Sequence, residues 1–163
     1  MTQKARQDLD ALELLMQDHR EVESLLREFE FLQQNRKATE GVIANACAEL
    51  RMHDTLETAI LYAEVRDAAN DEKTDRMVAE AEAEHDKILE LVEKVELART
   101  DDRQRDKYCS TLVEHVKRHV MADETERFPL VKRLARLDLG AVTAAMKKRK
   151  SALMSEMSDI FDK

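Results

Sequence analysis

Apolar side chains recur along the chain every three or four residues, which is the spacing of one face of an α-helix. The first such stripe lies in residues 8–34 and ends at the polar segment 33–37. Its members are Leu9, Leu12, Met16, Val22, Leu26 and Phe29. The pattern predicts a long amphipathic helix, and Thr39 is placed to cap the next one.

Three further stripes follow, separated by polar segments at residues 69–72 and 100–102. Their apolar members are Ile43, Ala46, Leu50 and Ile60 in the second stripe, Val78, Ala81, Ile88, Val92 and Val95 in the third, and Cys109, Leu112, Val116 and Leu130 in the fourth. Long helices joined by short connections pack as antiparallel neighbours. We therefore predict an all-α protein with an up-down-up-down four-helix bundle in residues 1–138.

Two residues near the end of the fourth stripe predict where that helix stops. Pro129 lacks the backbone donor that would bond to Thr125, so we expect the helix to kink or end there. Gly140 is typical of a helix terminus. The residues beyond it that keep helical spacing are Val142, Met146, Leu153, Met157 and Ile160. We predict an additional amphipathic helix in residues 139–163 that covers the bundle or joins two subunits of a homodimer.

The composition agrees with a helical domain. The 163 residues include two glycines and one proline, and 4% are aromatic and 38% charged. Such a chain has few turn formers and few strand formers, and its length suits one domain. Cys47 and Cys109 do not resemble a disulfide framework, so we interpret both as core residues.

Charge and hydropathy limit the classes of partner. The net charge is −8 with the two signs interspersed, which argues against nucleic-acid binding, and the basic run 147–150 is interpreted as a solvated helix face. No apolar stretch approaches the length that spans a bilayer, and residues 1–6 lack the apolar core of a signal peptide. We therefore expect a cytoplasmic protein with no membrane partner.

One histidine interrupts each apolar stripe. These residues are His19, His53, His85 and His119. The midpoints between successive histidines are residues 36, 69 and 102, and each midpoint falls in a break between predicted helices. In antiparallel neighbours, residues equally far from a shared turn face each other. We therefore expect all four imidazoles to meet at one level of the bundle axis.

Two acids accompany these histidines on the same faces. Glu57 and Asp123 follow His53 and His119 by four residues, about one helical turn. A buried carboxylate needs a compensating charge, and no lysine or arginine occurs on the stripes near this level. The charge of the two acids is therefore compensated by metal or by protonated histidine. A single buried histidine can also be a hydrogen-bonded core residue, so structural ion pairing is the alternative to a metal site.

The donor set bears on the choice of metal. Nitrogen and oxygen donors without thiolate suit iron, manganese or zinc. Six protein ligands exceed the four of a zinc site, and two acids placed to bridge indicate a pair of metal ions.

Four motifs, in this order, carry a resemblance to a known family. They are Asp18-His19, His53 with Glu57, Glu84-His85, and His119 with Asp123-Glu124 and Phe128-Pro129. Over about residues 8–135, the chain resembles the haemerythrin and HHE cation-binding family. The resemblance implies a four-helix bundle with a non-haem di-iron centre, in which carboxylates and an oxo or hydroxo group bridge two iron ions.

The resemblance also implies a set of metal ligands. They are His19, His53, Glu57, His85, His119 and one fourth-helix acid, either Asp123 or Glu124. Asp123 lies on the stripe, whereas Glu124 lies about 100° further round the helix but has a longer side chain. We favour Asp123 and keep Glu124 as a candidate.

The chain departs from the oxygen-carrying haemerythrins at Ala81, where the carriers have a further histidine. Glu82 and His115 are candidates to replace that ligand, although neither lies on a core stripe, and we expect a surface or supporting role for both. The missing ligand leaves a coordination position open. The expected function is therefore to bind or react with dioxygen, peroxide or nitric oxide, as a carrier or sensor or as a peroxidase, catalase-like enzyme or oxidase. The alternative is iron storage or iron sensing without turnover.

Overall fold

The computed structural model of the chain describes residues 9–98 and 101–161, with backbone alone for the last two. Residues 1–6, Asp8, Thr100 and the side chain of Ile160, which entered the predictions above, lie outside what is described.

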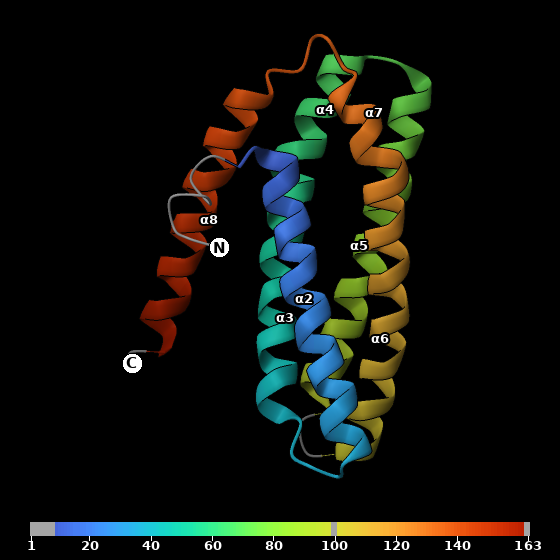
Figure 1. Cartoon of the computed structure of the whole chain (residues 1–163), viewed down its shortest axis with the longest axis vertical. Coiled ribbons are helices and arrows are strands. Elements are labelled where there is room, and N and C mark those ends of the chain that lie inside the picture. Colours follow the sequence, from blue (N-terminus) through green and yellow to red (C-terminus); the bar gives the residue numbers. More distant parts are fainter. Residues whose placement is uncertain (1–8, 99–100, 162–163) are drawn as a thin grey trace.

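Four long helical rods form the bundle, and no strand occurs in the described ranges. They are α2 (Ala11–Gln34), α3 (Glu40–Asp54) with η1 (Thr55–Tyr62) and α4 (Ala63–Ala69), α5 (Glu72–Leu97), and α6 (Asp102–Ala122) with η2 (Asp123–Arg127) and α7 (Phe128–Lys132). Successive rods run in opposite directions and pack side by side (Figure 1). The predicted all-α bundle is therefore confirmed.

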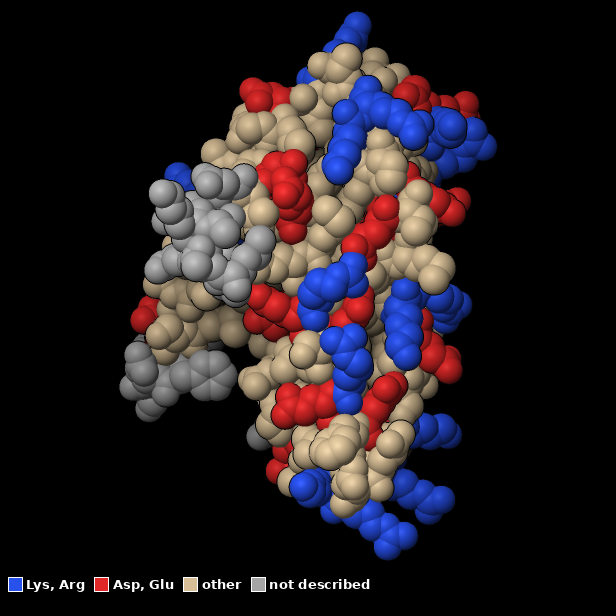
Figure 2. Space-filling view, in the orientation of Figure 1, with Lys and Arg blue, Asp and Glu red and all other residues tan. Residues whose placement is uncertain are grey.

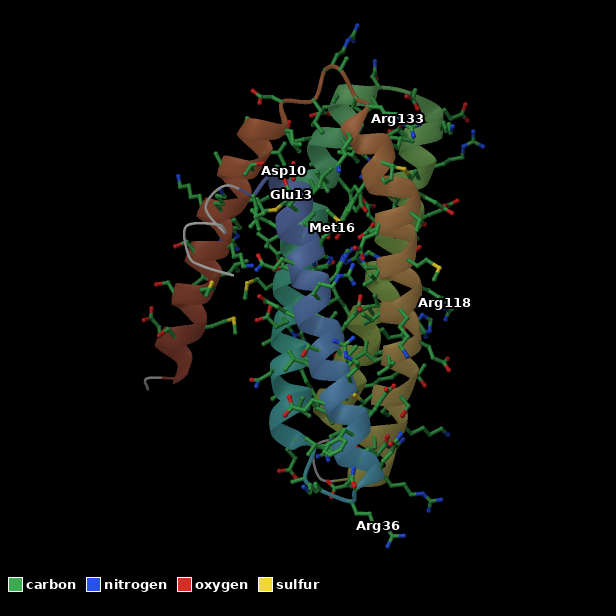
Figure 3. All side chains as sticks on the ribbon, in the orientation of Figure 1. Asp10, Glu13, Met16, Arg36, Arg118 and Arg133 are labelled. Carbon is green, nitrogen blue, oxygen red and sulfur yellow. The ribbon has the colours of Figure 1, made fainter. Side chains whose placement is uncertain are left out.

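Polar residues define the ends of the rods. Asp10 accepts a hydrogen bond from the Glu13 backbone N–H at 2.9 Å, and the two residues, labelled in Figure 3, form a capping box at the start of α2. Asn70 ends α4 in the left-handed conformation with φ 47°, and Asp71 then caps α5. The break predicted at residues 69–72 is thus confirmed.

Thr39 stands at the cap position of α3 but does not cap it. Its side chain makes no capping hydrogen bond, so this prediction is wrong. Instead, its hydroxyl accepts from Arg105 Nη2 at 3.0 Å and lies 3.2 Å from Asp106 Oδ1. The Thr39 hydroxyl, which we expected to cap α3, is therefore hydrogen-bonded to a buried arginine of α6.

The fourth rod continues past Pro129 to Lys132, so a helix end at this proline is wrong. The π-helical segment η2 precedes the proline, and Phe128 N–H bonds to Asp123 O, five residues back. Pro129 then lies in the first turn of α7, where its missing N–H has no required partner.

Gly140 is the second residue of α8 (Leu139–Phe161), so it lies at a helix terminus, the beginning of the additional helix. The additional helix itself is present. α8 is inclined to the bundle (Figure 1) and packs against α2 and η1, with Val142 and Met146 buried. It covers one side of the bundle, and a role between subunits stays a prediction.

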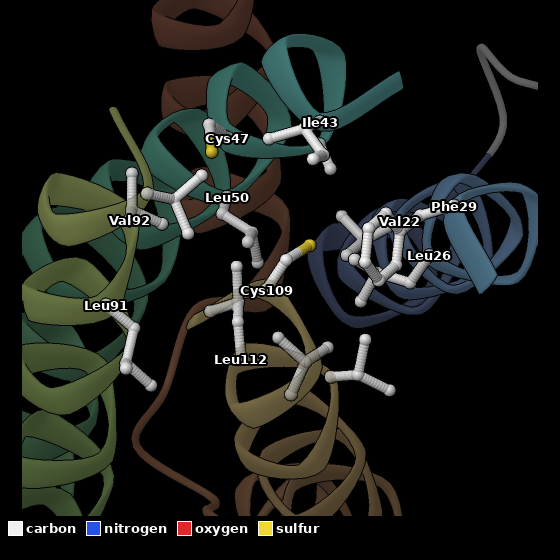
Figure 4. Packing of buried hydrophobic residues seen from close by; sticks show 14 of the residues in the cluster. Val22, Leu26, Phe29, Ile43, Cys47, Leu50, Leu91, Val92, Cys109 and Leu112 are labelled. Carbon is white, nitrogen blue, oxygen red and sulfur yellow. The ribbon is translucent and has the colours of Figure 1, made fainter. Parts of the chain in front are cut away.

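Two apolar clusters fill the bundle. One contains Phe29, Leu50 and Leu112, and Figure 4 shows these packing together with Cys47 and Cys109, both free thiols. The other contains Leu15, Leu61, Phe128 and Met146 among its members. On α2, the first cluster begins at Val22 and the second ends at Leu15, so His19 falls between them. A polar layer thus divides an otherwise apolar core, and the cysteines are core residues as predicted.

Positive and negative side chains intermingle on the face shown in Figure 2. Within the described helices, none combines the length and the apolar character needed to cross a bilayer.

Candidate metal centre

Four imidazoles meet between the two apolar clusters. The ring centroids of His19 and His53 are 4.7 Å apart, those of His85 and His119 are 4.4 Å apart, and all four side chains are buried. Each histidine comes from a different rod. The four lie at one level because successive histidines are about equally far from the connection between their rods. The meeting of four histidines at one level is confirmed.

Two fully buried carboxylates complete this cluster. Glu57 Oε2 lies 2.6 Å from His53 Nε2, and Asp123 Oδ2 lies 3.0 Å from His119 Nε2. One donor atom from each of five residues lies within 4.8 Å of all the others, and the five are His19, His53, Glu57, His119 and Asp123. We call these five residues and His85 the inner cluster. His85 joins at its edge, with Nε2 3.4 Å from Glu57 Oε1.

Both inner carboxylates lie in π-helical segments. Glu57 is the third residue of η1 and Asp123 is the first residue of η2. π-Helical turns are rare and occur often at functional sites, because the extra residue redirects side chains relative to an α-helix. The repeated spacing of histidine and acid was visible in the sequence, but the change of helix type had no signal there.

A second layer of carboxylates surrounds the imidazoles, and we call it the outer acids. Their closest oxygens lie 3.3, 3.9, 3.0 and 2.9 Å from a histidine Nδ1 in the pairs Glu124 with His19, Asp18 with His53, Asp54 with His85, and Glu84 with His119. In every pair the acid comes from a different rod than the histidine. A carboxylate at Nδ1 keeps the proton on that nitrogen and leaves Nε2 for a metal ion.

The outer acids were only partly found from the sequence. Asp18 and Glu84 belonged to the motifs above because each precedes a histidine, but each supports the histidine of the following rod. Asp54 directly follows His53 and supports His85. The available signal was the placement of an acid beside each histidine level on every rod.

Several close contacts in the inner cluster lack hydrogen-bond geometry. Glu57 Oε2, His85 Nε2, His119 Nε2 and Asp123 Oδ2 are buried atoms without a hydrogen-bond partner in the described chain. Two of these atoms nevertheless lie close to an imidazole nitrogen. Glu57 Oε2 is 2.6 Å from His53 Nε2, and Asp123 Oδ2 is 3.0 Å from His119 Nε2. Native proteins rarely leave such atoms unsatisfied. Polar atoms that crowd together without bonding to one another are the arrangement that a shared cation would satisfy.

One oxygen of each inner acid is held by protein groups, although Glu57 Oε1 also faces His85. Tyr62 Oη is 2.8 Å from Glu57 Oε1 and 2.7 Å from Asp123 Oδ1. Arg127 Nε donates to the same Asp123 oxygen at 2.6 Å, and its Nη2 donates to Glu84 Oε1 at 2.7 Å. Each inner acid therefore has one oxygen fixed and one directed into the cluster.

Arg127 and Lys150 correct the expectation that no basic side chain lies near this level. Arg127 is buried and bonds to Asp123, and Lys150 reaches Asp18 from α8. Arg127 was overlooked, although it lies four residues after Asp123 and three before Leu130, which places it on the fourth stripe.

The local charges still favour a cation. The inner and outer acids number six, while the basic side chains bonded to them are Arg20, Arg127 and Lys150. In the absence of metal, the histidines compensate. Burial lowers the pKa of His53, but the negative charge of Glu57 and the nearby carboxylates of Asp18 and Glu57 outweigh burial and raise that pKa to about 9. The pKa of His119 is likewise raised well above its usual value, by Glu57, Asp123 and Glu84 against burial. A metal ion would displace these protons.

The other candidate residues lie outside the inner cluster. Glu124 is an outer acid, and its second oxygen bonds to Arg20. Glu82 accepts from Arg66 Nη1 at 2.6 Å near the surface. His115 Nδ1 lies 3.4 Å from Arg118 Nη2, and Arg118 points away from the bundle in Figure 3. Ala81 is fully buried among apolar side chains.

Comparison with known proteins identifies one related family. The family model described as Hemerythrin HHE cation binding domain matches residues 10–131, a span that contains the whole inner cluster. No curated protein and no solved structure gives a significant match.

Proposed function

Because the chain belongs to the hemerythrin HHE cation-binding family, we propose that its core holds two iron ions that bind or react with a small molecule such as dioxygen, peroxide or nitric oxide. The family and the buried cluster of histidines and carboxylates support metal binding in general. The observation that carries the proposal is the set of inner atoms that crowd together without hydrogen-bond geometry, with His85 and His119 backed at Nδ1 by Asp54 and Glu84.

The proposed ligands are the six residues of the inner cluster. Asp123 is preferred over Glu124 because it is fully buried and its Oδ2 lies 3.0 Å from His119 Nε2. Glu124 is 18% exposed and faces His19 Nδ1, which suits a residue that orients a ligand. We expect Asp123→Ala to lose bound iron and its optical spectrum, and Glu124→Ala to keep most of both. The reverse result would exchange the two assignments.

Nitrogen and oxygen donors suit iron, manganese or zinc, and the family favours iron. Iron held here would polarise or reduce a bound molecule. The protein's own groups hold the ligands in place and manage a proton. Tyr62 has one hydroxyl proton for two carboxylate oxygens, so it donates to Glu57 or Asp123 but not fully to both. Leu61 and Phe128, both buried, exclude water from this side.

The proposed open position is at the level of Ala81, which has no donor atom. Replacement of Ala81 by histidine should close that position and slow any peroxide turnover. If Ala81→His leaves small-molecule binding and turnover unchanged, the open position lies elsewhere.

A second candidate function is iron sensing, in which metal occupancy is the signal. The contact between Lys150 on α8 and Asp18 favours it, because it links a peripheral helix to the centre. Steady-state consumption of peroxide or nitric oxide by the iron-loaded protein would support an enzyme. A spectral change that reverses on removing oxygen, without consumption, would support a carrier.

A further inference from the structure

The additional helix α8 reaches the metal centre through one side chain. Lys150 Nζ donates to Asp18 Oδ1 at 2.7 Å, across 132 residues of sequence. The Asp18 side chain is 4% exposed, and its other oxygen lies 3.9 Å from His53 Nδ1. One hydrogen bond and one electrostatic approach without hydrogen-bond geometry therefore link α8 to a proposed metal ligand.

This pairing differs from those of the other outer acids. Glu84 is bonded by Arg127, Glu124 by Arg20, and Asp54 by the Thr58 hydroxyl at 3.0 Å, and all these partners belong to the bundle. Asp18 alone among the four takes its bonded cation from α8. It is also the most buried of the four, since the others are between 18% and 35% exposed. Asp18 therefore depends on α8 for the charge that the others obtain from the bundle or from solvent.

The rest of α8 fixes where Lys150 lies. Met146 and Val142, one and two turns earlier, are buried in the apolar core, and the Thr143 hydroxyl accepts from Ala11 N–H at 2.8 Å. These contacts dock the first half of α8 on α2, the helix that carries Asp18. Lys150 is thus held at Asp18 by the packing of its helix and does not reach it as a free surface side chain.

We propose that Lys150 is a positioning residue of the metal centre, which acts through Asp18 on His53, and that docking of α8 and metal binding strengthen each other. The inference rests on the proposed metal site. With Lys150 in place, the buried Asp18 carboxylate stays directed at His53 Nδ1, and His53 Nε2 stays free for metal. Without Lys150, Asp18 would be a buried charge without its cation and would turn toward other partners. Coupling of this kind is reciprocal, so bound metal also stabilises the docked helix.

The test compares metal affinity in a double-mutant cycle. Lys150→Met keeps the aliphatic stem and removes the charge, and we expect affinity for ferrous ion to fall about tenfold, the lower end for residues that orient ligands. Asp18→Asn should cost at least as much, since it acts directly on His53. If Lys150 acts through Asp18, adding Lys150→Met to Asp18→Asn should cost little more. Additive losses, or an unchanged affinity in Lys150→Met, would overturn the proposal.

Two controls separate positioning from general stability. Lys148→Met removes an exposed lysine from the same helix and should leave affinity unchanged, while Lys150→Arg should restore most of it. Hydrogen exchange of the α8 amides should slow when wild-type protein binds metal and should respond less in Lys150→Met. An equal loss of metal affinity in Lys148→Met would count against the coupling. So would hydrogen exchange of the α8 amides at the same rate with and without metal. A wild-type chain that binds no metal would overturn the proposed function as well. Metal binding by the wild type with the same affinity in Lys150→Met would overturn this inference alone.

Discussion

At the scale of single residues, the centre depends on groups that hold ligands and do not themselves bind metal. Tyr62 is fully buried and lies between Glu57 and Asp123, which belong to different rods. Its hydroxyl fixes one oxygen of each acid, so the second oxygen of each stays directed at the imidazoles. Burial and the charges of these two acids raise the pKa of Tyr62 well above its usual value, so the phenol keeps its proton.

Tyr62→Phe should therefore disturb the centre while keeping the volume of the ring. We expect the metal-free protein to lose about 1–3 kcal/mol of unfolding free energy, because Glu57 Oε1 is left without its buried hydrogen-bond donor. The optical spectrum of the iron-loaded protein should also shift. Denaturant unfolding and absorption spectra measure both effects. Tyr108→Phe is the matched control, since its hydroxyl accepts only an exposed contact from Gln104, and equal effects in both variants would contradict the assignment.

At the scale of helices, the periodic pattern predicted much of the fold and the convergence of the histidines. Equal spacing of His19 and His53 about one turn is a property of chain length, and it survives local changes of helix type. The directions of side chains within η1 and η2 were not predictable, because a π-helical turn shifts every later residue off the α-helical stripe. Arg127, by contrast, lies on the fourth stripe four residues after Asp123 and was overlooked. The pairing of the outer acids with histidine Nδ1 atoms was missed because it joins different rods, which a stripe on one helix cannot show.

The segment η2 should be sensitive to loss of Arg127. Arg127→Met leaves the buried Asp123 and the partly buried Glu84 without their cation, and breaking a buried pair costs about 3–5 kcal/mol. Bound metal supplies positive charge at Asp123, so the loss should be smaller in the iron-loaded protein. Denaturant unfolding of both forms tests this. Arg66→Met, which breaks the surface pair with Glu82, should cost at most about 1 kcal/mol, and a comparable loss there would contradict the account.

At the scale of the whole molecule, folding brings together more negative than positive charge in the bundle core. Protonated histidines balance this charge when metal is absent, and metal should replace them. The pKa of His53 is raised to about 9 in the folded protein, and those of His85 and His119 are also raised. The usual histidine value of about 6.5 applies to the unfolded chain.

The stability of the metal-free protein should therefore depend on pH in a defined direction. A group whose pKa is raised on folding stabilises the fold fully below its unfolded pKa and loses that contribution as pH rises through its folded pKa. We expect the unfolding free energy of metal-free protein to fall between about pH 6.5 and pH 9. Metal affinity should rise over the same range, because fewer protons must leave. Urea unfolding at several pH values measures the first effect, and a flat or rising profile would contradict it.

The most direct test of the central claim is the metal content of the wild-type chain and of four variants, His19→Ala, His53→Ala, His85→Ala and His119→Ala. Iron per chain is measured together with the optical spectrum of the oxidised protein. We expect two irons and oxo-bridge charge-transfer bands in the wild type, and one iron or none without those bands in each variant. A wild-type chain that takes up no iron, or four variants that all retain two irons, would contradict it.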